Sequence, residues 1–179
     1  DRARRVVAVA GEQGAVLAPG RRVGAEGGGV AYLRPDRQGF MGVASLAGAL
    51  TDDTVLVSVQ AANSEVGAIQ PSRELAELAH KRGALFHTDA VQALGKMPLD
   101  VQKPGVDAAS FSAHKIGGPK GVGALHLKAR TPSSPYLLGG GQESGRRSST
   151  PTGPGITGFL AALAAATQAE PEESARPPA

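Results

Sequence analysis

Short apolar runs alternate with polar segments along most of the chain. Residues 54–59 are almost continuously Val and Leu, which is typical of a parallel strand buried on both faces. Residues 71–82 carry a proline suited to a first helical turn and a stripe of leucine and alanine, and Gly83 follows them, so they predict a helix. Residues 84–88 form the next strand. Strand, helix and strand in this order predict a right-handed crossover in an α/β sheet.

Weaker patterns complete the predicted fold. They indicate strands over 5–10, 30–33, 106–112 and 122–127, and helices over 15–17, 45–50 and 156–167. The loop 19–29 is rich in glycine and arginine, and we expect it to be mobile. Together these elements predict an α/β fold, a mostly parallel sheet with flanking helices, over residues 1–168. Residues 169–179 are rich in proline and glutamate, which predicts a disordered tail.

Chemically useful side chains follow three of the predicted strands. Asn63, Asp89 and the segment from Ser112 to Lys115 each come just after one. Ligands of open α/β sheets bind at the carboxyl ends of the strands, so we expect these residues to meet in one crevice. Convergence of three strand ends is a stronger signal than any single short motif.

The pair of Asp89 and Lys115 points to one cofactor. A lysine beside a strand end can form a Schiff base with a carbonyl group when neighbouring charge or desolvation lowers its pKa. A carboxylate can keep a pyridine nitrogen protonated, which lets the ring accept electrons. A lysine for the aldehyde and an acid for the ring nitrogen are what pyridoxal 5′-phosphate requires. A surface aspartate that caps the segment after Ala90 is the structural alternative.

Three motifs make a family resemblance specific. His87 to Gln92, Gly95-Lys96 and Phe111 to Gly123 resemble the cysteine desulfurase branch of the class V aminotransferases, which are fold-type I pyridoxal phosphate enzymes. The resemblance runs from about Val6 to about Ala166. It covers the middle of a family member, which is typically more than twice as long. It implies the central part of a large, cofactor-binding domain.

The resemblance also implies roles for single residues. Lys115 is the Schiff-base lysine, and His114 beside it is the second residue assigned to catalysis. Gln92 resembles the residue that hydrogen-bonds the phenolic oxygen of the cofactor, and Ser112 and His114 resemble its phosphate contacts. Thr150 would reach the phosphate of a neighbouring subunit, which implies a homodimer. The full set of implied cofactor residues is Asn63, Ser64, Asp89, Gln92, Ser112, His114, Lys115 and Thr150.

Several positions depart from the family pattern. Gln13 stands where the family usually has a histidine stacked on the cofactor ring, and Ser64 aligns with the second of two asparagines. Ser148-Ser149-Thr150 stands where the family has Ser-Gly-Thr. The sequence has no cysteine, so this chain as given cannot form a persulfide. We expect the family's N-terminal phosphate loop, and its C-terminal domain with the sulfur-accepting cysteine, outside residues 1–166.

The implied activity is cysteine desulfurase. L-Cysteine would yield L-alanine, and its sulfur would pass through an enzyme persulfide to a scaffold protein for iron–sulfur cluster assembly or to another carrier. Selenocysteine lyase is a close neighbour with the same cofactor. Two alternatives stay open. One is another class V enzyme, such as an aminotransferase, which needs no cysteine; the other is a truncated or degenerate relative without catalysis.

Composition excludes several other classes. The 179 residues carry a formal net charge of +3 and only 3% aromatic residues. Neither a basic face with interleaved aromatics nor a nucleic-acid-binding motif is visible, so we expect no nucleic-acid partner. Without cysteine, a thiolate metal site is excluded, and we predict no metal. No apolar run approaches a membrane span, and no hydrophobic signal segment follows the first residues, so we expect a cytoplasmic protein.

Overall fold

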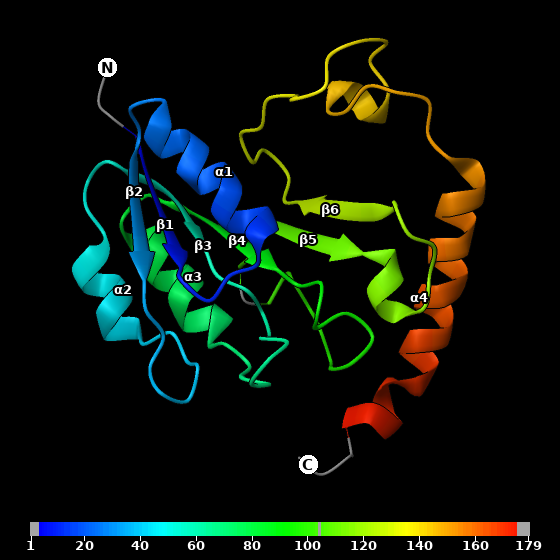
Figure 1. The fold of residues 1–179 in the computed structure, drawn as a ribbon, viewed down its shortest axis with the longest axis horizontal. Helices are drawn as coiled ribbons and strands as arrows, with labels where there is room; N and C mark the ends of the chain where they lie inside the picture. The colour runs from blue at the N-terminus through cyan, green and yellow to red at the C-terminus, as the bar shows by residue number, and fades with distance from the viewer. Residues whose placement is uncertain (1–3, 104, 175–179) are drawn as a thin grey trace.

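The computed structural model describes residues 4–103 and 105–174. Its centre is a six-stranded sheet in the order β2-β1-β3-β4-β5-β6 (Figure 1). The first five strands pair in parallel, and β6 runs antiparallel to β5. Their bounds are β1 Arg5–Val9, β2 Gly29–Leu33, β3 Thr54–Ser58, β4 Leu85–Asp89, β5 Ala108–Ser112 and β6 Gly123–Leu127. The predicted α/β fold with a mostly parallel sheet and flanking helices is confirmed.

Helices flank the sheet, as the crossover connections require. They are α1 Gly14–Ala25, α2 Val43–Ala49, α3 Ser72–Lys81 and α4 Gly153–Ser174, with two short 3₁₀ helices, η1 Ala113–Ile116 and η2 Glu143–Gly145. Helix α1 packs on β1 and β2, α3 packs on β4, and α4 runs along η1 beyond the end of the sheet (Figure 1). In the described part of the chain, no helix combines the length and the apolar character needed to cross a membrane.

The main core lies between the sheet and the helices α2 and α3. Phe86 and Val57 of the central strands pack there against Leu46 of α2 and Leu75 of α3, all fully buried. Val57 belongs to the continuous apolar run, and Leu75 to the helical stripe, that the sequence pattern predicted. Burying a side chain of this size contributes about 2 kcal/mol, and the packed layer fixes the positions of the strand ends.

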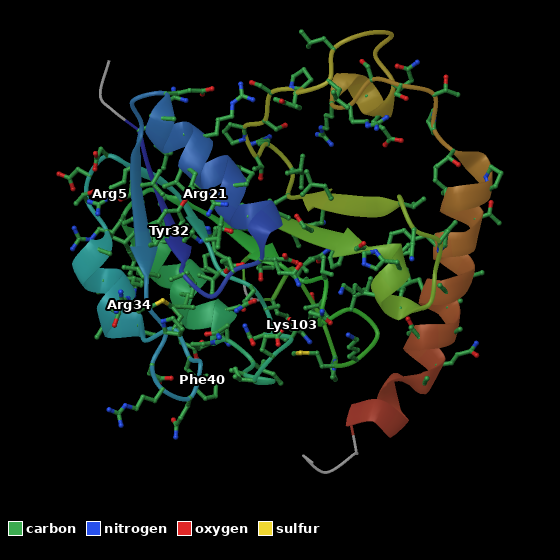
Figure 2. The ribbon with its side chains drawn as sticks, in the orientation of Figure 1. Arg5, Arg21, Tyr32, Arg34, Phe40 and Lys103 are labelled. Carbon is green, nitrogen blue, oxygen red and sulfur yellow. The ribbon has the colours of Figure 1, made fainter. Side chains whose placement is uncertain are left out.

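The expectation of a mobile loop over 19–29 is wrong. Helix α1 continues through Pro19 to Ala25, and its last turn is closed by a backbone hydrogen bond from Glu26 to Arg22. The hydroxyl of Tyr32 on β2 donates to the carbonyl of Leu17 at 3.1 Å, so Tyr32 joins the sheet to α1 (Figure 2). Gly20 leaves room for that ring, because a Cβ there would lie 2.6 Å from the Tyr32 oxygen. Packing on the sheet therefore overrides the weak helix propensity of this glycine-rich segment.

The disordered tail predicted for 169–179 is also wrong over residues 169–174. Helix α4 runs on to Ser174, while 175–179 lie outside the described residues. The physical reason is that the alanine-rich run of 161–166 and the glutamates after it are good helix formers, so the helix propagates beyond its apolar part.

A switch in connection direction determines where a ligand can bind. From β1 the chain passes through α1 to β2 on one side, and from β3 it passes through α3 to β4 on the other. Right-handed crossovers then place α1 and α3 on opposite faces. The carboxyl ends of β1 and β3 consequently border a crevice at the topological switch point of the sheet, where open α/β folds bind ligands.

The first prediction concerns the core that supports this edge. Replacement of Phe86 by alanine removes a fully buried ring and leaves a cavity, so the free energy of unfolding should fall by about 4 kcal/mol. Urea denaturation measures it. Phe40→Ala is the matched control, because Phe40 is 39% exposed (labelled in Figure 2) and should lose less than about 1 kcal/mol. Equal losses in the two variants would contradict the core assignment.

Candidate active site at the strand ends

Four strand ends contribute residues to one edge of the sheet. Glu12 follows β1, Gln60 follows β3, Asp89 is the last residue of β4 and Ser112 is the last residue of β5. Asp89 is the register partner of Ser110, so Ser112 and η1 come directly beyond it on the neighbouring strand. Parallel pairing thus brings the ends of β3, β4 and β5 to one edge of the sheet.

Asp89 is held by hydrogen bonds on both its main chain and its side chain. Its carbonyl oxygen accepts from the N–H of Ala61 at 2.8 Å, and its Oδ1 accepts from the N–H of Val91 at 3.0 Å. The second carboxylate oxygen has no hydrogen bond within the described part of the chain. A half-buried carboxylate with one oxygen fixed and one open can accept a proton donor from a ligand at the strand end.

Lys115 lies in η1, immediately after β5. The preceding Ala113 is fully buried, and Gly117 ends the 3₁₀ helix in a left-handed conformation with φ of 81°. A side chain at Gly118 would put its Cβ 2.9 Å from the carbonyl oxygen of Ala113, so the tight return needs glycine there. Lys115 is half-buried and makes no hydrogen bond or ion pair with any other described residue. The tight turn therefore fixes the backbone that carries Lys115, while its side-chain amine has no partner among the described residues.

Ser112 and His114 form a pair beside that lysine. The Ser112 hydroxyl and the His114 Nδ1 lie 2.8 Å apart, and the imidazole is exposed. A hydroxyl and a ring N–H on one short segment can both donate to an anion such as a phosphate. The role of these two side chains as phosphate contacts stays a prediction.

A polar row crosses the sheet just below Asp89. His87 lies between Ser58 of β3 and Ser110 of β5, with Nδ1 2.8 Å from the Ser58 hydroxyl and Nε2 2.9 Å from the Ser110 hydroxyl. Burial lowers the pKa of His87 below 6.5, and the nearby Asp89 opposes this shift. A neutral imidazole satisfies the row, since one ring nitrogen donates and the other accepts. Sequence analysis missed this row, although the alternation of β4 puts His87 on the same face as Asp89.

Glu12 is the other site residue that sequence analysis missed. It is only 5% exposed, its Oε1 accepts from the N–H of Gln60 at 2.6 Å, and its Oε2 is buried without a partner among the described residues. Burial raises the pKa of Glu12 to about 7, the negative charge of Asp89 adds to the rise, and the Gln60 hydrogen bond partly opposes it. The sequence signal that could have identified Glu12 is a glutamate placed between a buried strand and the start of a helix.

Three predicted cofactor contacts are engaged elsewhere in this structure. The Oδ1 of Asn63 accepts from the N–H groups of Glu65 and Val66, at 2.8 and 3.0 Å, so it shapes its own loop. Ser64 is exposed, and its hydroxyl donates to the Glu65 side chain at 3.3 Å. The amide oxygen of Gln92 accepts from Lys96 Nζ at 2.5 Å. These residues lie on the loops after β3 and β4, but the described contacts do not join them to Lys115.

Thr150 lies in a different part of the molecule. It is exposed on the segment between η2 and α4, which Figure 1 shows on the far side of β6 from η1. The neighbouring Ser149 has a φ of 120°, a conformation that favours glycine. The expected family pattern has glycine at that position, so the backbone keeps a glycine conformation although the residue is serine. No described contact joins Thr150 to Asp89 or Lys115.

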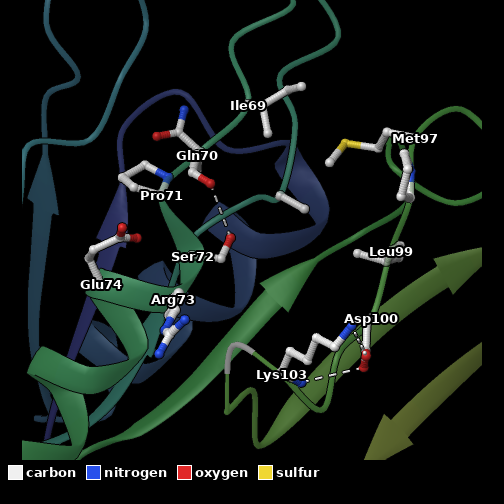
Figure 3. A pocket seen from close by; sticks show the side chains of 12 residues that line it. Ile69, Gln70, Pro71, Ser72, Arg73, Glu74, Met97, Leu99, Asp100 and Lys103 are labelled. Atoms are coloured by element: carbon white, nitrogen blue, oxygen red, sulfur yellow. Dashed lines mark hydrogen bonds and ion pairs between the residues drawn. The ribbon is translucent and has the colours of Figure 1, made fainter. Parts of the chain in front are cut away.

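A hollow on the described surface adjoins these strand ends at Ala61. Its volume is about 330 Å³, and Ile69, Met97 and Leu99 give it apolar walls while Asp100 and Lys103 pair at 3.6 Å on its rim (Figure 3). Neither Asp89 nor Lys115 lines it. The candidate site is instead an open edge. Within the described residues no cluster of three or more potential metal ligands gathers.

Comparison with known proteins identifies the family. A family model described as aminotransferase class-V matches residues 1–176. The chain belongs to the class-V aminotransferase family. It is 44% identical over 163 residues to the cysteine desulfurase IscS of Clostridium botulinum, which covers 91% of this chain and 41% of that relative. It is 42% identical over 176 residues to IscS of Methanosarcina thermophila, with 98% and 43% covered.

Solved structures agree with the fold. A NifS-like protein superposes with a TM-score of 0.92 at 40% identity, covering 96% of this chain and 48% of its own. SspA, solved in complex with cysteine, superposes with a TM-score of 0.87 at 31% identity, covering 97% and 52%. This class-V chain thus spans about half the length of the relatives that it matches. The predicted resemblance to fold-type I cysteine desulfurases is confirmed.

Class-V family members depend on pyridoxal phosphate, and the strand ends fit that group. Lys115 provides an unengaged amine for an aldehyde, and Asp89 provides an open carboxylate oxygen for a ring nitrogen. Ser112 and His114 provide paired donors for a phosphate. Gln13, at the N-cap of α1, can offer an amide plane where the family has an imidazole, but no aromatic face.

The second prediction concerns the strained serine. Ser149→Gly should raise the free energy of unfolding by about 1 kcal/mol, because glycine adopts the positive φ without Cβ strain. Thermal or urea denaturation measures the gain. In the matched control, Ser148→Gly, stability should fall, since Ser148 is buried and its hydroxyl accepts from the N–H of Gly141 at 3.4 Å. A loss in both variants would contradict the strain.

Proposed function

We propose that the chain is the cofactor-binding part of a pyridoxal phosphate enzyme of the cysteine desulfurase type. The observation that carries the proposal is the open carboxylate of Asp89 at the end of β4 together with the unengaged amine of Lys115 in η1, directly after the neighbouring strand β5. The identity of 42–44% to desulfurases named IscS supports the reaction type. The substrate would be L-cysteine, and the carbon product L-alanine.

Each residue has a defined task under this proposal. Lys115 would hold the cofactor through its aldehyde carbon and would carry protons to and from the substrate carbon. Asp89 holds a proton on the ring nitrogen, and Ser112 and His114 hold the phosphate. When bound, the cofactor supplies an electron sink for the substrate carbon. The thiolate that takes the sulfur lies outside this sequence, which contains no cysteine.

A homodimer is part of the proposal. Large apolar side chains are exposed on the β6 and α4 side of the molecule, with Tyr136 and Leu138 each 81% exposed and Leu160 61% exposed. Such surface is typical of a face that another chain or domain covers. Thr150 lies on the same side and would reach the phosphate of the second subunit. A sulfur-accepting scaffold for iron–sulfur clusters is the proposed partner, and the cytoplasm the proposed location.

Two alternatives have specific support. The missing cysteine is compatible with a class-V aminotransferase, which transfers an amino group and needs no thiolate. The engagement of Asn63 and Ser64 within their own loop, with Gln13 at the stacking position, favours a non-catalytic relative. Product analysis with L-cysteine, compared with an amino donor and a keto acid, separates the two enzymes, and cofactor binding separates both from the non-catalytic relative.

The third prediction tests cofactor attachment. Pyridoxal phosphate added to the chain should form a yellow adduct, and borohydride reduction followed by peptide mass spectrometry should find the label on Lys115. Lys115→Ala should lose the label and the colour. Lys120→Ala is the matched control, because that exposed lysine lies on the turn before β6 and should keep both.

Asp89→Asn should still be labelled, but it should bind the cofactor more weakly by a factor of about 10 or more, because a neutral amide pairs poorly with a charged ring nitrogen. Label scattered over Lys81, Lys96, Lys103 and Lys120, or no label at all, would overturn the proposal for this chain.

A further inference from the structure

Glu12 lies at the topological switch point of the sheet. It follows β1, whose connection leaves through α1, and it contacts Gln60, which follows β3, whose connection leaves through α3. A carboxyl at this point is directly beside the site where the fold binds ligands. The roles assigned so far to Asp89, Lys115, Ser112 and His114 do not use it.

Two hydrogen bonds link Glu12 to Asp89 through the adjacent residues Gln60 and Ala61. The Oε1 of Glu12 accepts from the N–H of Gln60 at 2.6 Å, and the next N–H along the chain, that of Ala61, donates to the carbonyl of Asp89 at 2.8 Å. The side-chain amide of Gln60 also reaches the carbonyl of Gly11 at 3.4 Å. The Glu12 side chain and the Asp89 backbone are therefore both bound to the two-residue stretch Gln60-Ala61 that follows β3.

The surroundings of Glu12 favour its uncharged form. The side chain is 5% exposed, and its Oε2 has no hydrogen-bond partner among the described residues, so an ionised carboxylate there would be half satisfied. The charged group that faces it is Asp89 of β4, of the same sign. Gln60 of β3 and Gln13 of α1 are uncharged, and His87 of β4 is kept neutral by burial. Two neighbouring carboxyls in such a place ionise one at a time.

We propose that Glu12 is a positioning residue of the cofactor site, a buried carboxyl that is held by Gln60, faces Asp89 and is uncharged below neutral pH. Its action on a cofactor rests on the proposed function, but its pairing with Asp89 does not. A ligand at the strand ends then faces a single negative charge. That charge is on Asp89, whose second carboxylate oxygen is open. The burial that raises the pKa of Glu12 to about 7 supports this division.

The pairing has a reciprocal consequence. The negative charge of Asp89 raises the proton affinity of Glu12, so removal of that charge must lower it. A ligand that brings a protonated ring nitrogen to Asp89 must lower it as well, since a positive charge offsets the negative one. Glu12 should therefore release its proton when such a ligand binds near neutral pH.

The fourth prediction is a carbon-13 NMR titration of the side-chain carboxyl carbons. Glu12→Gln identifies the Glu12 signal, and through-bond assignment does so independently if that variant does not fold. In the unchanged chain the Glu12 carboxyl should titrate at about pH 7 rather than near 4.5. In Asp89→Asn the midpoint should move to lower pH. In the control Glu65→Gln, which removes an exposed carboxylate from the loop after β3, the Glu12 midpoint should stay in place.

Stability provides a second readout, with a definite sign. A carboxyl whose folded-state pKa is raised favours the folded state at low pH, and this advantage is lost as the pH rises from 4.5 towards and through about 7. The urea midpoint of the unchanged chain should therefore fall between about pH 5 and about pH 8, relative to that of Glu12→Gln. Glutamine keeps the oxygen that accepts from Gln60, whereas Glu12→Ala should lose stability at every pH.

The outcomes separate this inference from the proposed function. If pyridoxal phosphate labels Lys115, addition of the cofactor should lower the Glu12 midpoint in the unchanged chain. If no label forms, the response to Asp89→Asn still tests the pairing. A Glu12 carboxyl that titrates near 4.5, or one that ignores Asp89→Asn, would overturn the inference even in a chain that binds the cofactor.

Discussion

The site depends on the way in which backbone groups fasten the exits of the parallel strands to one another. Each strand that leaves the sheet exposes N–H and C=O groups that have lost their ladder partners. Here the Glu12 carboxyl takes the N–H of Gln60, and the Asp89 carbonyl takes the N–H of Ala61. The two strands at the switch point and the neighbouring strand β4 thereby share one rigid edge. The backbone of Asp89 is held at that edge, and its side chain is oriented by the hydrogen bond from the N–H of Val91.

Burial determines which side chains at this edge are charged. The row of Ser58, His87 and Ser110 is satisfied by a neutral imidazole, and the lowered pKa of His87 keeps it neutral. The raised pKa of Glu12 favours a neutral carboxyl on the other side of Asp89. An isolated negative charge between two neutral groups is a specific partner for a protonated ring nitrogen. A cluster of carboxylates would be less specific, because its members would share protons with one another.

The site is open at the strand ends. Lys115 is half-buried and His114 is exposed, while apolar side chains of the β6 and α4 side face solvent. The paired hydroxyl and imidazole of Ser112 and His114 are nevertheless preformed. The local turn sets them, because glycine at 117 and 118 closes η1 tightly on Ala113.

The sequence by itself determined the alternation of strands and helices, the strand ends that carry Asp89 and Lys115, and the family. Those features depend on local pattern, since continuous Val and Leu runs and a helical stripe need no distant partner to be visible. Only the tertiary structure decided that 14–25 is one helix, because Tyr32 packs over Gly20 and holds it on the sheet. The neutral state of His87 and the proton on Glu12 were also invisible, because burial and the nearness of Asp89 are properties of the folded chain.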